Sequence, residues 1–243
     1  MTYLISELWP GGPLFNDGEN LFPIVADSVL LAYFANNTRL KPKKRAADLG
    51  CGSGVISVLL AMNDPMLTVD SIEIQHSAAV LAIENAESSG TSGRLAVIEC
   101  DLRRHRDLLQ AGAYDLAISN PPYFAQGSGK RPADSAIEAA RAEGSCTLDD
   151  ICKAAGYLTR YGGAFFLVHK PERLTSVFRS LSGAGFEPKR VRFVQHTYSS
   201  PPSLVLIESR RGGKPSLDVQ APLILFNANG SDTDEAKAIY RRK

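Results

Sequence analysis

The stretch of residues 46–54, AADLGCGSG, constrains the fold of this chain more than any other part of it. A short apolar approach ends in an acidic side chain, and three glycines then follow at alternating positions before an apolar run at helical spacing. This order predicts a strand, a tight turn and a helix. Glycine allows the sharp turn and lets a ligand approach the bare backbone at the N-terminus of the helix. The residues concerned are Asp48, Gly50, Gly52, Gly54 and the run 55–60.

The size and composition of the chain are those of an ordinary soluble globular protein. Its 243 residues lie in the range of a single α/β domain, and 44% of them are hydrophobic and 22% charged. The formal net charge is only +1, from 27 basic and 26 acidic residues. A polyanionic partner would therefore have to contact local basic patches rather than a uniformly basic surface.

The cysteines and the N-terminal sequence indicate a reducing compartment. The four cysteines form no CxxC pair and have no ligand-like neighbours, so we expect reduced thiols and no metal site. The first residues, MTYLISE, lack a basic segment followed by an apolar one, and no apolar run approaches membrane-spanning length. We therefore expect a cytoplasmic protein that does not contact a membrane.

Strands and helices are predicted to alternate along most of the chain, which favours a doubly wound, mostly parallel α/β sheet. Ser77 is expected to cap the helix that follows the second strand. The connection between the last two strands is short, so that these two strands can pair antiparallel. With residues 46–49, the expected strands are 67–74, 95–101, 114–119, 163–168, 187–194 and 203–209, and the helices are 55–60, 77–88, 147–158 and 171–181.

The two ends of the chain are less regular. Residues 9–20 are rich in glycine, proline and asparagine and predict a loop or hairpin. Residues 22–34 predict a helix whose apolar pattern is interrupted by Asp27 and Ser28, and this helix either packs on the domain or covers a ligand. After the last strand comes one more apolar run at residues 222–226, followed by a polar, helix-like end.

Polar side chains follow four of the predicted strands. They are Asp48 with the glycines, Glu73, Asp101 and the segment 120–123, NPPY. In open α/β sheets ligands bind outside the carboxyl ends of the strands. Glu73 lies 19 residues after Gly54, a spacing that suits an acid bound to the hydroxyls of a ribose.

The segment NPPY narrows the choice of ligand. The glycine turn lacks the Lys-Ser/Thr of a P-loop, which leaves a dinucleotide or S-adenosylmethionine. Two prolines in succession fix the backbone, so that the Asn120 side-chain oxygen and the Pro121 carbonyl can both accept from one amino group. Tyr123 adds an aromatic face that can stack on a planar base or amide. Such a site would aim the lone pair of an amine at a methyl sulfonium.

These motifs together resemble the class I S-adenosylmethionine-dependent N-methyltransferases. The resemblance rests on DLGCGSG, Glu73, Asp101 and NPPY, and it extends along nearly the whole chain. Within that class, the chain is most similar to the bacterial tRNA (adenine-N6)-methyltransferases that act on the anticodon loop of valine tRNA. This narrower likeness rests on residues 22–31, Ala140-Arg141, LVHKPERL at 167–174 and EPKRVRFV at 187–194.

The resemblance implies a seven-stranded Rossmann-like sheet with an antiparallel last strand, in a single domain of residues 1–243. Residues 1–44 would form an N-terminal loop and helix, 45–209 the catalytic core and 210–243 a C-terminal extension. It further implies S-adenosyl-L-methionine as cofactor, S-adenosyl-L-homocysteine as product and tRNA as partner, with no obligate protein partner evident. The implied catalytic residues are Asn120, Pro121 and Tyr123. The implied cofactor-binding residues are Asp48, Gly50, Gly52, Gly54, Glu73, Asp101, Leu102 and Asn120, and the implied substrate-binding residues are Pro122, Tyr123, Phe124, Lys130, Arg131 and Arg141.

Several interpretations stay open at this point. NPPY also occurs in release-factor glutamine methyltransferases, although only about 45 residues precede the glycine turn here, fewer than their helical substrate-binding domain needs. A DNA adenine methyltransferase and a non-catalytic RNA-binding scaffold remain alternatives, and a nicotinamide dehydrogenase fits worst. His169 and His196 are candidate proton acceptors that we expect to be structural. Phosphate contacts could come from basic clusters at 41–45, 103–106, 130–131 or 210–214, of which the first precedes strand one and should lie on the opposite edge.

Overall fold

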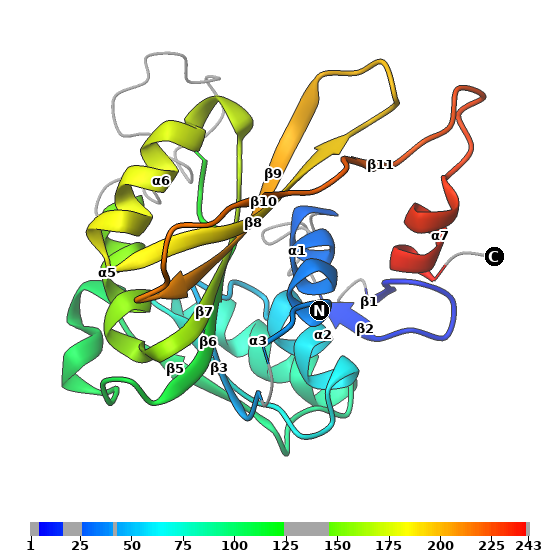
Figure 1. Ribbon diagram of the computed structural model, residues 1–243. Coiled ribbons are helices and arrows are strands. Elements are labelled where there is room, and N and C mark those ends of the chain that lie inside the picture. Colours follow the sequence, from blue (N-terminus) through cyan, green and yellow to red (C-terminus); the bar gives the residue numbers. More distant parts are fainter. Residues whose placement is uncertain (1–4, 17–25, 41–42, 124–145, 242–243) are drawn as a thin grey trace, which may run out of the picture.

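A nine-stranded sheet forms the centre of the structure, a computed structural model that describes residues 5–16, 26–40, 43–123 and 146–241 (Figure 1). Five parallel strands lie in the order β5-β4-β3-β6-β7. The chain builds outward from β3 in one direction and then returns to the other side of it. The strand order therefore reverses between β3 and β6. The strands are β3 (Arg45–Leu49), β4 (Thr68–Glu73), β5 (Leu95–Glu99), β6 (Tyr114–Ser119) and β7 (Thr159–His169).

The remaining strands continue the sheet beyond β7. β9 (Pro202–Arg211) pairs antiparallel with both β7 and β8 (Phe186–Gln195), which confirms the antiparallel pairing predicted from their short connection. The seven predicted strands are therefore all present. Two dipeptide strands that were not predicted, β10 (Asp218–Val219) and β11 (Leu223–Ile224), pair in parallel with β8. β9, the antiparallel strand, lies inside the sheet because it pairs with β7 on one side and with β8 on the other.

Helices cover both faces of the sheet. α1 (Ala26–Asn36), α2 (Val55–Asn63) and α3 (His76–Ser88) pack on one face, while α5 (Leu148–Leu158) and α6 (Leu174–Gly183) pack on the other. Successive residues of the buried strands alternate between the two cores, so Leu116 and Ile118 face the α1–α2 side and Ala117 faces α5. Shorter elements are the hairpin β1 (Ile5–Glu7) and β2 (Leu14–Asn16), η1 (Leu102–Asp107), η2 (Pro171–Arg173) and α7 (Asp234–Tyr240). Among the described residues, no helix is long and apolar enough to cross a membrane.

The starts of α5 and α3 show one local capping signal that is present in the structure and one that is not. Thr147 caps α5 in a reciprocal capping box with Asp150. The expectation that Ser77 caps α3 was wrong, because Gln75 occupies the N-cap position and Ser77 lies in the first turn. The Glu73 carboxylate accepts hydrogen bonds from the N–H groups of Ile74 and Gln75, both at 2.9 Å, and the helix begins directly after that turn.

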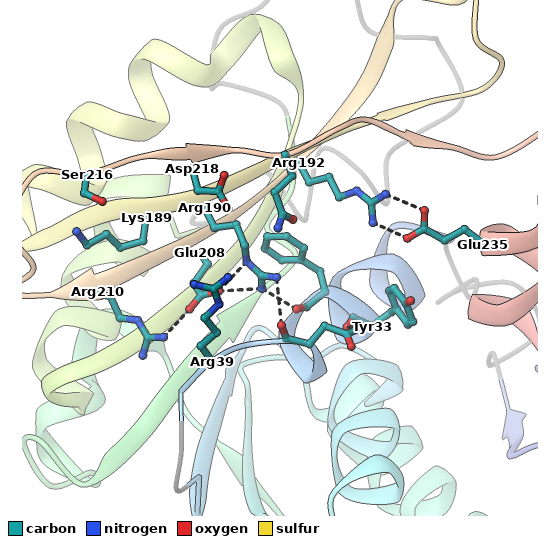
Figure 2. A pocket seen from close by; sticks show the side chains of 13 residues that line it. Tyr33, Arg39, Lys189, Arg190, Arg192, Glu208, Arg210, Ser216, Asp218 and Glu235 are labelled. Atoms are coloured by element: carbon teal, nitrogen blue, oxygen red, sulfur yellow. Dashed lines mark hydrogen bonds and ion pairs between the residues drawn. The ribbon is translucent and has the colours of Figure 1, made fainter.

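The C-terminal half of α1 is clamped to the outer strands through a buried carboxylate. Glu208 of β9 is 4% exposed and forms ion pairs with Arg190 at 2.8 Å and with Arg210 at 2.7 Å. The Arg190 guanidinium lies 3.9 Å from the Phe34 ring centroid and also donates to the Phe34 carbonyl at 2.9 Å. Arg192 pairs with Glu235 of α7, and this whole set lines a cavity of about 520 Å³ between α1, β8, β9 and the C-terminal segment (Figure 2).

We predict that Glu208→Ala lowers the free energy of unfolding by about 3 kcal/mol or more, because it leaves two partly buried guanidinium groups without their shared counter-ion. Urea unfolding followed by circular dichroism measures this. Glu187→Ala is the matched control, since this half-buried glutamate of β8 has no ion pair in the described part of the chain. A Glu208→Ala protein as stable as the control would contradict the clamp.

Candidate functional site

Three loops leave the sheet side by side at the carboxyl ends of β3, β4 and β6. The parallel register pairs Leu49 with Ile72, and Asp48 with Ile118, so that the three strands end at nearly the same level. The N–H of Gly50 donates to the Ile72 carbonyl at 2.8 Å. This edge, next to the point where the strand order reverses, is where open α/β sheets bind ligands.

The glycine turn has the backbone that its sequence predicts. Gly50, Gly52 and Gly54 have φ values of +73°, +55° and +82°, a region that disfavours residues with a Cβ atom. A Cβ at Gly52 would meet no atom within 4 Å, so the space beside this backbone is open. A Cβ at Gly54 would lie 3.1 Å from that of Ala82, which shows that this glycine lets α2 and α3 pack closely.

Glu73 is held against the glycine turn. One carboxylate oxygen accepts a hydrogen bond from the N–H of Gly52 at 3.0 Å, and the other accepts from Ile74 and Gln75. The side chain is 7% exposed. Of about four acceptor positions on a carboxylate, three are filled by backbone donors, which leaves capacity for a further donor. Glu73 thus fixes the shape of the turn, a function that its spacing alone did not predict.

Asp48 is fully buried beneath the turn. Its Oδ2 accepts from Ser57 Oγ at 2.7 Å, and Ser71 Oγ donates to Ser57 Oγ at 2.6 Å. The second oxygen, Oδ1, is buried with no hydrogen-bond partner in the described part of the chain. Removal from water, only partly offset by the Ser57 hydrogen bond, raises the pKa of Asp48 to about 7.

Asp101 and Leu102 follow β5 at the same edge of the sheet. Asp101 caps η1 and forms an ion pair with Arg103 at 2.6 Å. Hydrogen bonding to the Arg103 guanidinium holds the pKa of the Asp101 carboxyl below its usual value. The Leu102 side chain is buried in the core on the α5 face.

The NPPY segment is tied to the N-terminus of α1. Asn120 Nδ2 donates to Ser28 Oγ at 3.1 Å, and the Tyr123 hydroxyl lies 2.9 Å from Asn120 Oδ1 and 2.5 Å from Asp27 Oδ2. Burial and the neighbouring Asp27 carboxylate raise the pKa of Tyr123. Pro121 is buried and Pro122 is exposed. Ser28 and Asp27, the two residues that interrupt the apolar pattern of α1, therefore form hydrogen bonds with the side chains of Asn120 and Tyr123.

The last residue of β7, His169, and Lys170 after it complete the surroundings of Tyr123. The His169 ring packs edge-on against it with centroids 5.4 Å apart, and the Lys170 ammonium lies 4.8 Å from the Tyr123 ring centroid. His169 Nδ1 accepts from the N–H of Lys170 at 2.8 Å, and burial lowers the pKa of His169. His196 lies in the β8–β9 connection, where its ring packs on Phe226.

The structure thus brings most of the predicted residues to one edge. The carboxyl ends of neighbouring strands carry Asp48, the three glycines, Glu73, Asp101, Leu102 and the NPPY segment. The predicted residues Phe124, Lys130, Arg131 and Arg141 lie outside the described residues. Sequence reasoning did not assign Asp27, Ser28 or Lys170 to the site. For the first two a signal existed, since polar residues interrupt an apolar helical pattern there.

Most arginines of the predicted basic clusters are already engaged within the protein. Arg45 pairs with Asp70, Arg103 with Asp101, and Arg210 with Glu208. Arg106 lies over the Tyr157 ring. These clusters therefore contribute less free positive charge than their sequences suggest.

The sequence profile of the methyltransferase small domain family matches residues 25–174, more than half of the chain. The chain belongs to this family. A curated relative is the tRNA1(Val) (adenine(37)-N6)-methyltransferase of Yersinia pseudotuberculosis, which is 35% identical over 141 residues. That match covers 58% of this chain and 54% of the relative, so this methyltransferase small domain protein spans about half the length of the curated relatives it matches.

Solved structures show the same Rossmann-like methyltransferase fold. A predicted O-methyltransferase of Agrobacterium tumefaciens superimposes with a TM-score of 0.72 at 20% identity, over 89% of this chain and 96% of that one. Geranyl diphosphate C-methyltransferase of Streptomyces coelicolor, solved with S-adenosyl-L-homocysteine, superimposes with a TM-score of 0.53 at 13% identity, over 75% of this chain and 77% of that one.

We predict that this methyltransferase small domain protein loses stability as the pH rises from about 4 to about 7. The ordinary pKa of an aspartic acid side chain is 3.8, and burial raises that of Asp48 to about 7 in the folded state. Within this interval the folded state therefore keeps a proton that the unfolded chain releases. The contribution of Asp48 to the free energy of unfolding should fall by roughly 2–4 kcal/mol over the interval. His169, whose pKa is lowered by burial, contributes in the opposite sense just below its ordinary pKa, so the effect of Asp48 is read from the difference between variants. Asp48→Asn should flatten that part of the curve, measured by urea unfolding at several pH values.

The exposed Asp107 supplies the control for this experiment. Asp107→Asn removes an acid whose one ion pair within the described residues is with the exposed Arg104, and it should follow the wild-type pH dependence. A slope unchanged by Asp48→Asn would show that the Asp48 carboxyl titrates in its ordinary range.

Proposed function

We propose that this protein transfers a methyl group from S-adenosyl-L-methionine to the exocyclic N6 of an adenine in tRNA, next to the anticodon. The observation that carries the proposal is the placement of NPPY, at the carboxyl end of β6 and directly beside the glycine turn after β3. In this position an amine acceptor and a cofactor on the glycine turn would face each other.

The residues around the glycine turn fit this cofactor. The buried Asp48 Oδ1 lacks a partner among the described residues and can accept from a cationic amino group, and the open space at Gly52 leaves room beside bare backbone. Glu73 retains acceptor capacity for a ribose hydroxyl, and Asp101 with Leu102, which follow β5 at the same edge, would contact the adenine ring. When bound, S-adenosylmethionine supplies an electrophilic methyl group on a sulfonium.

The acceptor amine would be held by two oxygens, the Asn120 Oδ1 and the Pro121 carbonyl. Both accept N–H hydrogen bonds, which directs the nitrogen lone pair away from them. With the cofactor bound, this nitrogen would form the new N–C bond as the methyl group leaves the sulfonium, and one amine proton would pass to water. Alignment and desolvation can supply much of the rate, so no strong base is needed. The lowered pKa of His169 leaves that ring neutral near pH 7, and its contact with Tyr123 gives it a structural role.

The choice of adenine in tRNA draws on the named relatives and on energetics. The curated relatives are named as tRNA1(Val) (adenine(37)-N6)-methyltransferases. A base must leave its stack to reach the NPPY segment, and this costs less in a loop than in a duplex. Because the proposed substrate is tRNA, we also propose that the protein is cytoplasmic, as expected from the sequence.

The direct test is methyl transfer from labelled S-adenosylmethionine to bulk unmodified tRNA, with release factor and duplex DNA as alternative acceptors. We expect label in tRNA that digests to N6-methyladenosine. Asn120→Ala should lower transfer by about a hundredfold or more while the cofactor dissociation constant stays near that of the wild type. Label in release factor would move the acceptor to a protein amide, and equal loss of transfer and cofactor binding in Asn120→Ala would contradict its role toward the amine.

Asp27 has a defined part in this arrangement. The Tyr123 hydroxyl carries one proton but lies within hydrogen-bonding distance of two acceptors, Asp27 and Asn120. The shorter contact and the charged acceptor favour donation to Asp27. The Asn120 oxygen then keeps its lone pairs for the target amine. Asp27 is therefore a positioning residue for Asn120.

A double-mutant cycle tests this role. Asp27→Ala should lower kcat about tenfold, because the Tyr123 hydroxyl then donates to Asn120 and competes with the amine. In a Tyr123→Phe background the competing hydroxyl is absent, so the same substitution should have little further effect. Thermal unfolding and cofactor binding serve as controls. An Asp27→Ala effect of equal size in both backgrounds would mean that Asp27 only stabilises α1.

A further inference from the structure

The turn between β8 and β9, residues 196–201, presents an unusually exposed aromatic side chain. Tyr198 is 88% exposed, more than any other large hydrophobic residue in the described part of the chain. No ion pair, hydrogen bond or ring contact engages its side chain among the described residues. An aromatic ring held in water offers both faces for stacking.

The turn that carries Tyr198 is well ordered by its own hydrogen bonds. The N–H of Ser200 donates to the Thr197 carbonyl at 3.1 Å, which closes a turn with Tyr198 at its first central position. The hydroxyls of Thr197 and Ser200 lie 2.7 Å apart in a further hydrogen bond. Tyr198 therefore projects from a preformed loop, which reduces the entropy lost when a partner binds.

The C-terminal segment braces the base of the same turn. The ring of His196 packs on that of Phe226 with centroids 4.5 Å apart, and the N–H of Phe226 donates to the His196 carbonyl at 2.8 Å. β11 continues this contact by pairing with the end of β8. The unpredicted edge strand β11 thus has a consequence for the turn, since it holds the end of β8 from which the turn begins.

The turn projects past the edge at which the candidate site lies (Figure 1). The last residue of β7 that pairs with β9 is His169, opposite Val205, and Tyr123 packs on His169. β9 begins three residues earlier, at Pro202, so the strand extends about 10 Å beyond this level at roughly 3.3 Å per residue. Tyr198 consequently stands above and to one side of the NPPY segment.

Two cationic side chains belong to a segment that contacts both the NPPY residue Tyr123 and the strand β9, which begins at this turn. Lys170 and Arg173 belong to the segment that links β7 to α6, and η2 packs against β9. Neither of these cations has an ion-pair partner in the described residues, in contrast to Arg45, Arg103 and Arg210. Lys170 lies over the Tyr123 ring, which leaves its ammonium group without a counter-ion. Glu172 lies between them in sequence, so this stretch carries a net charge of +1.

We propose that the β8–β9 turn, with Lys170 and Arg173, forms a surface that binds the single-stranded RNA flanking the target adenine. Tyr198 stacks on a neighbouring unpaired base, and the two cations contact the phosphates between that base and the adenine at Tyr123. The proposal rests on the proposed function, whose RNA acceptor it makes more specific. An aromatic face combined with unpaired cations is how proteins bind single-stranded nucleic acid.

Single-stranded RNA fits this surface better than a duplex. In a duplex the base faces are stacked on each other and closed to an aromatic side chain, whereas loop bases can splay out. The Thr197 and Ser199 hydroxyls at the turn can donate to phosphate or sugar oxygens, which adds affinity without selecting a base.

Steady-state kinetics with unmodified tRNA test the stacking role. Tyr198→Ala should raise KM for tRNA about tenfold, with kcat and cofactor binding near wild type. Tyr198→Phe keeps the ring and should restore the wild-type KM. Tyr161→Ala is the matched control, because Tyr161 is 76% exposed but lies near the start of β7, at the opposite edge of the sheet.

The salt dependence of RNA binding tests the cations. Fluorescence anisotropy with a labelled anticodon stem-loop should give a slope of log Kd against log salt that is smaller by about 0.7 in Arg173→Gln than in the wild type, as expected for one lost phosphate contact to a single strand. Exposed Arg179 on α6 supplies the control as Arg179→Gln, which should keep the wild-type slope.

The outcomes separate this surface from the proposed function. If the wild type methylates tRNA while Tyr198→Ala matches it in KM, the surface is wrong and the methylation proposal stands. If the wild type labels only release factor, or binds no stem-loop, the RNA surface is overturned together with its premise. Equal KM increases in Tyr198→Ala and Tyr161→Ala would also overturn the surface, because the effect would then not depend on this edge.

Discussion

The parallel pairing of β3 with both β4 and β6 is the constraint on which the site depends. Parallel strands in register end at the same edge, so the loops that follow them must emerge together. Asp48, Glu73 and Asn120 are separated by tens of residues in the chain, yet each stands at the end of one of these three strands. The sheet itself therefore brings these three side chains to one edge, and the glycine turn adds only the positive φ angles of its glycines.

Two carboxyl groups near the glycine turn, those of Glu73 and Asp48, differ in their burial and in their hydrogen-bond donors. Glu73 satisfies three of its acceptor positions with N–H groups, which stabilises its charge without a cation. Asp48 has one hydroxyl partner and, among the described residues, an unpartnered oxygen, so burial shifts its pKa upward. The two carboxyls thus differ in what they offer a ligand. Glu73 is already engaged by three backbone donors, whereas Asp48 gains most from a donor that arrives with positive charge.

The sequence predicted the sheet well because its signals are local. The glycine turn, the buried run in β7 and the short β8–β9 connection each specify structure within a few residues. The cap of α3 was missed because the Glu73 carboxylate, held against the glycine turn by a hydrogen bond to Gly52, also closes the turn before that helix. The edge strands β10 and β11 were missed because two-residue strands carry no period. The contacts of Asp27 with Tyr123, and of Arg190 with Glu208, join residues far apart in the chain, and such pairs leave no pattern in a single sequence.

α1 connects the site to the outermost part of the sheet. Its first turn holds Asn120 and Tyr123 through Ser28 and Asp27, and the carbonyl groups at its other end accept hydrogen bonds from Arg190. Cations are favoured at a helix C-terminus, where carbonyl groups are unpaired and the helix dipole is negative. α1 has eleven residues and a length of about 16 Å, so one continuous helix joins the contacts of Arg190 at one end to those of Asn120 and Tyr123 at the other. The NPPY side chains are thus linked through α1 to β8, the strand that β10 and β11 border and that leads into the turn with Tyr198.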